Sequence, residues 1–242
     1  MRNLVLLAVF FLIYLIPAYS QERILISADF ILRNQHLSTV DPGGYFISDQ
    51  YTKRITYGLG VELNLTQRIS VSTGIQRTFF VTDVNFWFLT SGYVLFFKSN
   101  PITGRQIPIS INYNLVKFDS KSRWRLGASG GVSVSFINKS SGTGYGTVKN
   151  IDRTIAINYN DDHSPVRRNF ITFDIGGFVK YRLSRSLWAA YRFSYLQSFA
   201  EAIVVNNIRY SVTTGSATTD YVAQTVANGN AIHHTLGIQF AF

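Results

Sequence analysis

The chain has 242 residues, carries no cysteine and has a formal net charge of +10 at pH 7. The lack of cysteine excludes disulfides and thiol chemistry. Aromatic and charged residues each make up 15% of the chain, whereas average proteins carry about 25% charged residues. The basic residues are scattered rather than clustered, so we expect them to contact anionic lipid head groups and not nucleic acid.

The first twenty residues have the pattern of a cleaved signal peptide. Arg2 precedes an almost unbroken apolar run over Leu4–Ile16, and Ala18-Tyr19-Ser20 offers small residues at the two positions that a signal peptidase reads. The run is short for a membrane-spanning helix, although a retained amino-terminal anchor is the alternative. We therefore expect residues 1–20 to be removed and residues 21–242 to form one domain.

Eight segments of the remaining chain alternate between apolar and small or polar residues with the period of two that indicates a β-strand. They begin near Ile24, Ile55, Ile69, Ile107, Trp124, Ile171, Leu187 and Ala231. The apolar face of the last segment holds Ile232, His234, Leu236, Ile238, Phe240 and Phe242. The third segment is less regular because Arg77 falls on its apolar side; either this side chain reaches the membrane interface or a bulge shifts the phase.

The connections between these segments alternate between short and long. Short turns are predicted at residues 66–68, 119–123 and 184–186, and the long connections are a loop around residues 41–44 and residues 83–104, 138–168 and 201–229. An even number of strands closes a barrel with both ends on the same side. A soluble lipocalin-like barrel is the alternative, but it would place its apolar residues inside, whereas here the polar face carries most of the charged strand residues. The sequence predicts an all-β fold, a single eight-stranded antiparallel up-and-down transmembrane β-barrel.

The predicted barrel resembles the small eight-stranded outer-membrane proteins of the OmpA/OmpX type. The most specific part of the resemblance is the closing strand, where Leu236, Ile238, Phe240 and Phe242 match the alternating terminal signal that the barrel-assembly machinery reads. The resemblance implies an integral protein of a Gram-negative outer membrane, with four long extracellular loops and three short periplasmic turns. It is a resemblance to a class and indicates no individual member.

Charged side chains are predicted to face the barrel interior. This set consists of Asp29, Glu62, Arg125, Asp174, Lys180, Arg182 and Arg192. An eight-stranded barrel is just wide enough for inward side chains to fill it, so we expect ion pairs that bridge the lumen and plug it. The alternative is a small passive channel or hydrophobic-solute conduit, in which these pairs rearrange.

Histidine and serine residues near the predicted long loops raise the possibility of a lipid A-modifying enzyme. They are His36 and Ser38, His163 and Ser164 beside Asp161 and Asp162, and His233 and His234. A nucleophilic serine needs a base within hydrogen-bond reach and an orienting acid, which the sequence does not provide. The acidic residues and His163 could ligate a metal, but adjacent loop residues are more often solvated. We expect no catalysis, metal or cofactor.

The long loops are the predicted place of function. Residues 85–97 are apolar, and they could extend the barrel strands, lie in the membrane interface or form a protein-binding surface. β-prone pieces at residues 154–159 and 203–212 are expected to project as hairpins whose edges can pair with a partner. We therefore expect a monomer that acts as a structural or interaction protein. Its partners would bind through residues 85–104, 138–168 and 201–229.

Overall fold

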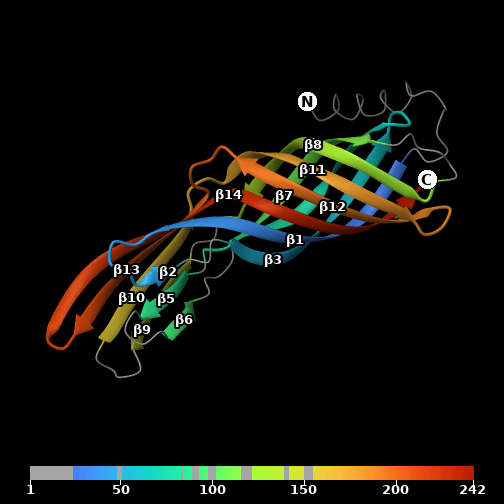
Figure 1. Cartoon of the computed structure of the whole chain (residues 1–242). Helices are drawn as coiled ribbons and strands as arrows, with labels where there is room; N and C mark the ends of the chain where they lie inside the picture. Colours follow the sequence, from blue (N-terminus) through green and yellow to red (C-terminus); the bar gives the residue numbers. More distant parts are fainter. Residues whose placement is uncertain are drawn as a thin grey trace.

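A computed structural model gives the fold of the chain (Figure 1). It describes residues 24–47, 51–82, 84–88, 93–97, 102–115, 122–138, 142–149 and 155–242. The predicted signal peptide lies outside these ranges. Within them, no helix is long and apolar enough to cross a membrane.

Eight antiparallel strands close into a barrel, which confirms the predicted fold. They are β1 (Ile24–Val40), β3 (Tyr51–Asn64), β4 (Ile69–Phe80), β7 (Ile102–Asn114), β8 (Trp124–Ile137), β11 (Asn169–Arg182), β12 (Leu187–Ser198) and β14 (Ala217–Ala241). Each strand pairs with the next, and β14 returns to pair with β1. The backbone groups of Ile24 and Phe242 bond to each other at this closure, with Phe242 N to Ile24 O at 2.9 Å. Because the ends meet, the closing strand has no free edge in the barrel.

The faces of the barrel strands agree with the predicted alternation. Phe30 is 65% exposed and Phe242 is 70% exposed, whereas their neighbours on the other face point inward. Exposed aromatic rings gather at both margins of this apolar belt. At the end with the short turns (the short-turn end) they are Tyr113, Trp124, Phe240 and Phe242, and at the opposite, long-loop end they are Tyr57, Phe136, Tyr195 and Phe199. Aromatic girdles on either side of an apolar band are typical of transmembrane barrels.

β14 belongs to the barrel and also to a second region that projects beyond it. Residues 231–240 pair with β12, and residues 217–227 pair instead with β13 (Val204–Thr214). The partner changes at residues 228–230, where the pairing with β1 also shifts register. Gly229 has a φ of +89° here, a backbone conformation that favours glycine. We call residues 228–230 the switch segment.

The projecting region adds further strands to the barrel sheet, beyond the long-loop end (Figure 1). β13 pairs with β10 (Ile155–Pro165), which pairs in turn with β9 (Gly142–Lys149), and these strands lie beyond the long-loop end. The hairpins predicted from residues 154–159 and 203–212 are therefore confirmed. The sequence did not indicate that the two hairpins join each other through β10 and β13.

A separate three-stranded sheet lies beside this projection (Figure 1). It consists of β2 (Phe46–Ile47), β5 (Val84–Phe88) and β6 (Tyr93–Phe97). Of the three alternatives for residues 85–97, extension of the barrel strands does not hold, because the backbone of residues 85–88 and 93–97 pairs within this sheet. The predicted connection over residues 83–104 is shifted along the chain, since β4 ends at Phe80 and β7 begins at Ile102.

An apolar layer crosses the long-loop end of the lumen. Its members come from β1, β4, β7, β8, β11, β13, β14 and the segment before β13, and all are buried: Leu37, Phe80, Ile102, Ile137, Phe170, Ala200, Ile203, Val204 and Ala227. The Phe80 and Phe170 rings pack edge to face with centroids 5.6 Å apart. We call this set the apolar layer. It lies where the barrel meets the projection.

The switch segment generates a prediction about how the projection is attached. A Cβ at Gly229 would collide with Ile203 Cδ1 of the apolar layer, whereas a Cβ at Gly215 has nothing within 4 Å, although Gly215 also has a positive φ of 62°. We expect Gly229→Val to lower the free energy of unfolding by about 1–3 kcal/mol more than Gly215→Val, because only Gly229→Val overpacks a buried cluster. Urea unfolding measures the free energy, and limited proteolysis reports release of the projection. Equal effects of the two substitutions would contradict this account of the switch.

Candidate functional site

The strongest polar contact in the lumen joins β3 to β11 across the barrel. Lys180 Nζ lies 2.6 Å from both carboxylate oxygens of Glu62, and both residues are buried. Ser70 Oγ donates to Glu62 Oε1 at 2.8 Å. The carboxylate therefore accepts three hydrogen bonds from two donor groups, the arrangement that a buried charge needs.

The other two predicted lumen carboxylates bond to hydroxyl groups. Ser27 Oγ donates to Asp29 Oδ2 at 3.1 Å, and Ser110 Oγ lies 3.4 Å from Asp174 Oδ1. Asp29 has room only because residue 237 is glycine, since a Cβ there would collide with Asp29 Oδ1. The small residues of the inner face thus give the carboxylates the space that they occupy.

Arg192 connects the middle of the lumen through amide and hydroxyl groups. Its Nη2 donates to Asn112 Oδ1 at 3.0 Å. Asn112 Nδ2 in turn donates to Ser70 Oγ at 3.3 Å and to Ser72 Oγ at 3.2 Å. Because Ser70 also contacts Glu62, these bonds link the arginine to the Glu62–Lys180 pair.

The remaining predicted cations lie near the short-turn end around a buried indole. The Arg125 guanidinium carbon is 4.1 Å from the Trp188 ring centroid, and that of Arg182 is 5.6 Å from it. Arg182 also donates to the carbonyls of Ser184 and Arg185 in the turn. Trp188 is fully buried and gives both guanidiniums a cation–π partner.

One charged contact at the other end of the lumen was missed by the sequence reasoning. Arg33 Nη1 donates to His233 Nε2 at 3.1 Å, and its Nη2 lies 3.4 Å from Gly229 O in the switch segment. The Arg33 guanidinium also lies 5.0 Å from the centroid of Phe80 in the apolar layer. Arg33 and His233 both fall on the predicted polar faces, but only the closure of β14 on β1 makes them opposite neighbours.

Little open space remains between these layers. Two hollows lie among the lumen side chains, one of about 70 Å³ near Glu62 and Lys180 and one of about 30 Å³ near Asp174 and His233. A hollow needs a volume of at least about 10–15 Å³ to hold one water molecule, so each of these hollows has room for a few waters.

The histidines lie in separate environments. His163 is buried in the projection, where it pairs in register with Asn206, and His234 Nδ1 is hydrogen-bonded to Tyr191 OH at 2.9 Å. His36 lines a hollow of about 230 Å³ with Tyr195 at the margin of the barrel. Among the residues that the structure describes, no three His, Asp or Glu side chains gather as metal ligands would.

Tyrosines form the centre of the projection. Tyr159, Tyr210 and Tyr221 lie opposite one another on β10, β13 and β14, and the Tyr210 and Tyr221 rings stack at 5.3 Å. Tyr45 packs against both of these rings from the loop after β1. Tyr210 OH donates to Asp41 Oδ1 at 2.6 Å, and burial together with this contact raises the pKa of the phenol. The loop is therefore fixed to the projecting sheet.

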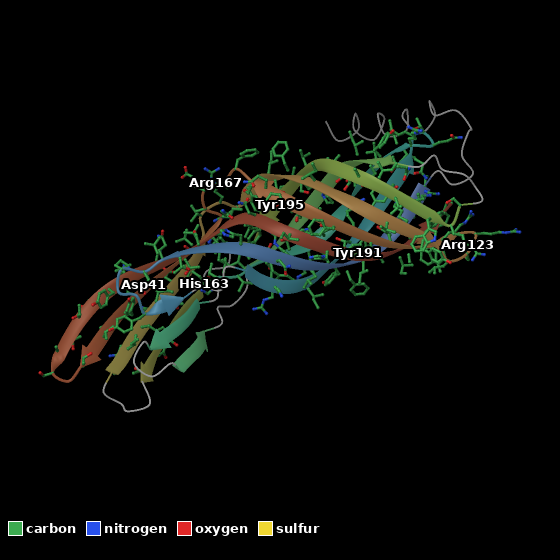
Figure 2. All side chains as sticks on the ribbon, in the orientation of Figure 1. Asp41, Arg123, His163, Arg167, Tyr191 and Tyr195 are labelled. Atoms are coloured by element: carbon green, nitrogen blue, oxygen red, sulfur yellow. The ribbon has the colours of Figure 1, made fainter. Side chains whose placement is uncertain are left out.

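Figure 2 shows how far apart the two ends of the molecule lie. Asp41 and His163 lie where the projecting strands leave the barrel, and Arg123 lies at the opposite end. Tyr191 and Tyr195 are on the barrel wall between them. Side chains of the projection are thus separated from the short-turn end by the length of the barrel.

No protein-family model matches the chain, and neither does any curated protein sequence. Several solved structures are similar. The outer-membrane protein OprG from Pseudomonas aeruginosa has a TM-score of 0.52 and 11% identity, over 91% of this chain and 96% of that one. Neisserial surface protein A has a TM-score of 0.43 and 10% identity, over 90% and 97%. The outer-membrane protease OmpT from Escherichia coli has a TM-score of 0.42 and 11% identity, over 93% and 99%.

The similarity to OprG shows that the chain has the fold of an outer-membrane barrel protein. The resemblance to small eight-stranded barrels is thereby confirmed at the level of fold. At 11% identity the similarity carries no information about activity.

The Glu62–Lys180 pair generates a prediction about stability. Lys180→Met leaves Glu62 buried without its counter-charge, so we expect it to lower the free energy of unfolding by about 3–5 kcal/mol. The double variant Glu62→Gln/Lys180→Met removes both charges and should recover most of that loss. Urea unfolding in detergent, followed by tryptophan fluorescence, measures both.

The exposed turn residue Arg123 provides the control, because Arg123→Gln should change the free energy by no more than about 0.5 kcal/mol. If Lys180→Met were as mild as Arg123→Gln, the buried pair would not hold the lumen together.

Proposed function

We propose that the protein is an integral outer-membrane barrel with a plugged lumen, and that it acts as a structural or interaction protein through its long-loop end. The observation that carries this proposal is the contrast between the two parts of the structure. Buried side chains lie at successive levels of the lumen, which supports a plugged interior, whereas β9 is the last of the described strands in the large sheet.

The membrane location is supported by the outer surface of the barrel. Apolar side chains that alternate with buried polar ones are exposed all around the wall, including Phe30, Leu59, Ile111, Ile175 and Leu236. In water such a continuous apolar belt would drive association, and lipid is the surrounding that satisfies it. Where neighbouring strands of a closed barrel are paired, their backbone groups bond to each other and need no water. The long-loop end is then extracellular and the short-turn end periplasmic.

The plugged lumen is supported by four successive layers of side chains. From the periplasmic end they are the Trp188 group with its two arginines, the Glu62–Lys180 network, the Arg33–His233 contact and the apolar layer. The two hollows that lie between these layers, of about 70 Å³ and about 30 Å³, are small, which supports a closed lumen. No step of this proposed role requires a catalytic residue or a cofactor.

The interaction role is supported by the free edge of the projection. Among the strands that the structure describes, β9 is the last in the order of the large sheet, and an edge strand of this kind can pair with a further strand. Tyr145 on this strand is 90% exposed. An extended segment of a partner protein, added to this edge as a further strand, fits these features.

Cysteine labelling on intact cells tests this arrangement, and the chain carries no cysteine that would interfere. We expect Tyr145→Cys to react with a membrane-impermeant maleimide, while Arg123→Cys at the periplasmic end reacts only after the cells are lysed. A photo-crosslinker attached to Tyr145→Cys should give discrete adducts that Arg123→Cys does not give.

Gel migration of unheated and heated samples shows that each variant is folded. Labelling of Arg123→Cys but not Tyr145→Cys on intact cells would show that the barrel has the opposite orientation to the one proposed. Labelling of Tyr145→Cys without any adduct would remove the interaction role and leave a structural one.

A further inference from the structure

The barrel wall opens between β3 and β4 towards the long-loop end. The two strands pair from Asn64–Ser70 only as far as Gly58–Gln76. Beyond that point β3 continues along β1 as far as Tyr51, and β4 continues along β7 as far as Phe80. The hydroxyl of Thr56 donates to Arg77 O across the gap, in place of the backbone ladder.

A hollow of about 740 Å³ lies at this separation. Its outward wall is apolar and includes Phe30, Tyr57, Leu59 and Ile75, all of them exposed on the lipid-facing side. The volume falls within the range of roughly 300–1,000 Å³ that is common for small-molecule sites. We call this hollow the wall groove.

Two arginines lie side by side at the margin of the wall groove that is nearer the long-loop end. Arg77 on β4 pairs in register with Arg105 on β7, and both side chains are exposed. Adjacent like charges on neighbouring strands destabilise a sheet unless an anion lies between them. Asp29 is the sole acidic residue that lines the groove, and it accepts a hydrogen bond from Ser27.

Aromatic contacts hold one of these arginines in place. The Arg77 guanidinium lies 4.8 Å from the centroid of Phe79 and 5.9 Å from that of Tyr57, and its Nη1 donates to Tyr57 OH at 3.3 Å. The β4–β7 register is unbroken on both sides of Arg77, so no bulge places it on the apolar face. The contacts leave further guanidinium donors available for a ligand.

The strand geometry places both arginines at the outer boundary of the apolar belt. Ile69 pairs with Tyr113 in the periplasmic girdle, and Arg77 pairs with Arg105 eight residues farther along β4. At about 3.4 Å per residue and a tilt of about 40°, this distance corresponds to about 20 Å along the membrane normal, against an apolar band of roughly 25 Å. A membrane lipid presents its charged head group at this level and its acyl chains directly below.

We propose that the wall groove binds one phosphate-bearing membrane lipid, with its phosphate between Arg77 and Arg105 and an acyl chain against Phe30, Leu59 and Ile75. Guanidinium groups match phosphate through charge-assisted hydrogen bonds, and the apolar wall matches the chain. This site rests on the membrane location that we propose above. The bound lipid would be a specific ligand for two of the basic residues that are scattered along the chain.

Native mass spectrometry of the full-length protein tests the site, with dimyristoyl phosphatidic acid as the probe. We expect the wild type to retain one lipid and Arg77→Gln/Arg105→Gln to bind it at least about tenfold more weakly, the effect of losing one charge-assisted hydrogen bond. Arg68→Gln/Arg123→Gln, which removes two exposed arginines from the periplasmic turns, is the matched control and should bind as the wild type does.

Two further measurements distinguish the contribution of the acyl chain to binding from that of the phosphate. Ala28 lines the groove on the exposed face, so Ala28→Trp should fill it and weaken lipid binding while both arginines remain. Dimyristoyl glycerol, which lacks the phosphate, should bind poorly, and inorganic phosphate should not displace the lipid. Displacement by inorganic phosphate would overturn the lipid site in favour of a simple anion site.

Insertion into vesicles is measured on the same samples, so that two failures can be distinguished. A wild-type protein that does not insert contradicts the proposed membrane location. Normal insertion with equal lipid binding by the wild type and Arg77→Gln/Arg105→Gln overturns the wall-groove site alone. If the double arginine variant does not fold, undiminished binding by Ala28→Trp overturns the site instead.

Discussion

The narrow interior of an eight-stranded barrel is the constraint on which the rest of this structure depends. Every second residue of each barrel strand points into a space that is only wide enough for side chains. Charges there must find partners inside the protein, as Glu62 and Lys180 do at 2.6 Å. Large side chains need small ones opposite them: Phe178 packs where residue 127 is glycine, and a Cβ on that glycine would collide with the ring.

The same constraint favours the long-loop end over the lumen as the place of the proposed interaction. The apolar layer packs at the long-loop end of the barrel, and the switch segment lets β14 leave β12 and continue beside β13. One strand thus belongs to both the barrel and the projection. Arg33 connects the two regions, because it contacts His233 in the lumen, Gly229 in the switch segment and Phe80 in the apolar layer.

The sequence predicted those features that depend on local periodicity. The faces of the strands follow from an alternation of two, and the inward direction of Asp29, Glu62 and Lys180 follows from the same pattern. The apolar layer could not be predicted, because Phe80, Ile137 and Ile203 lie near the ends of strands or in loops and meet only after the barrel closes. The contact partners of individual charged residues could not be predicted either, since Arg33 and His233 are 200 residues apart in the chain.

The wall groove illustrates the same limit. Arg77 interrupts the apolar face of its strand, and this irregularity was visible in the sequence. That Arg105 lies beside it on the next strand of the barrel depends on the β4–β7 register, which joins strands separated by a long connection. Residue patterns therefore predicted the membrane barrel well, and contacts between distant strands much less well.

The proposal that side chains close the lumen is tested by single-channel conductance of the purified protein in a planar lipid bilayer. We expect no steady, discrete openings after insertion, under conditions in which a porin control conducts. Steady openings of uniform conductance would contradict it, because they would require a water-filled path through the apolar layer and past the Glu62–Lys180 pair.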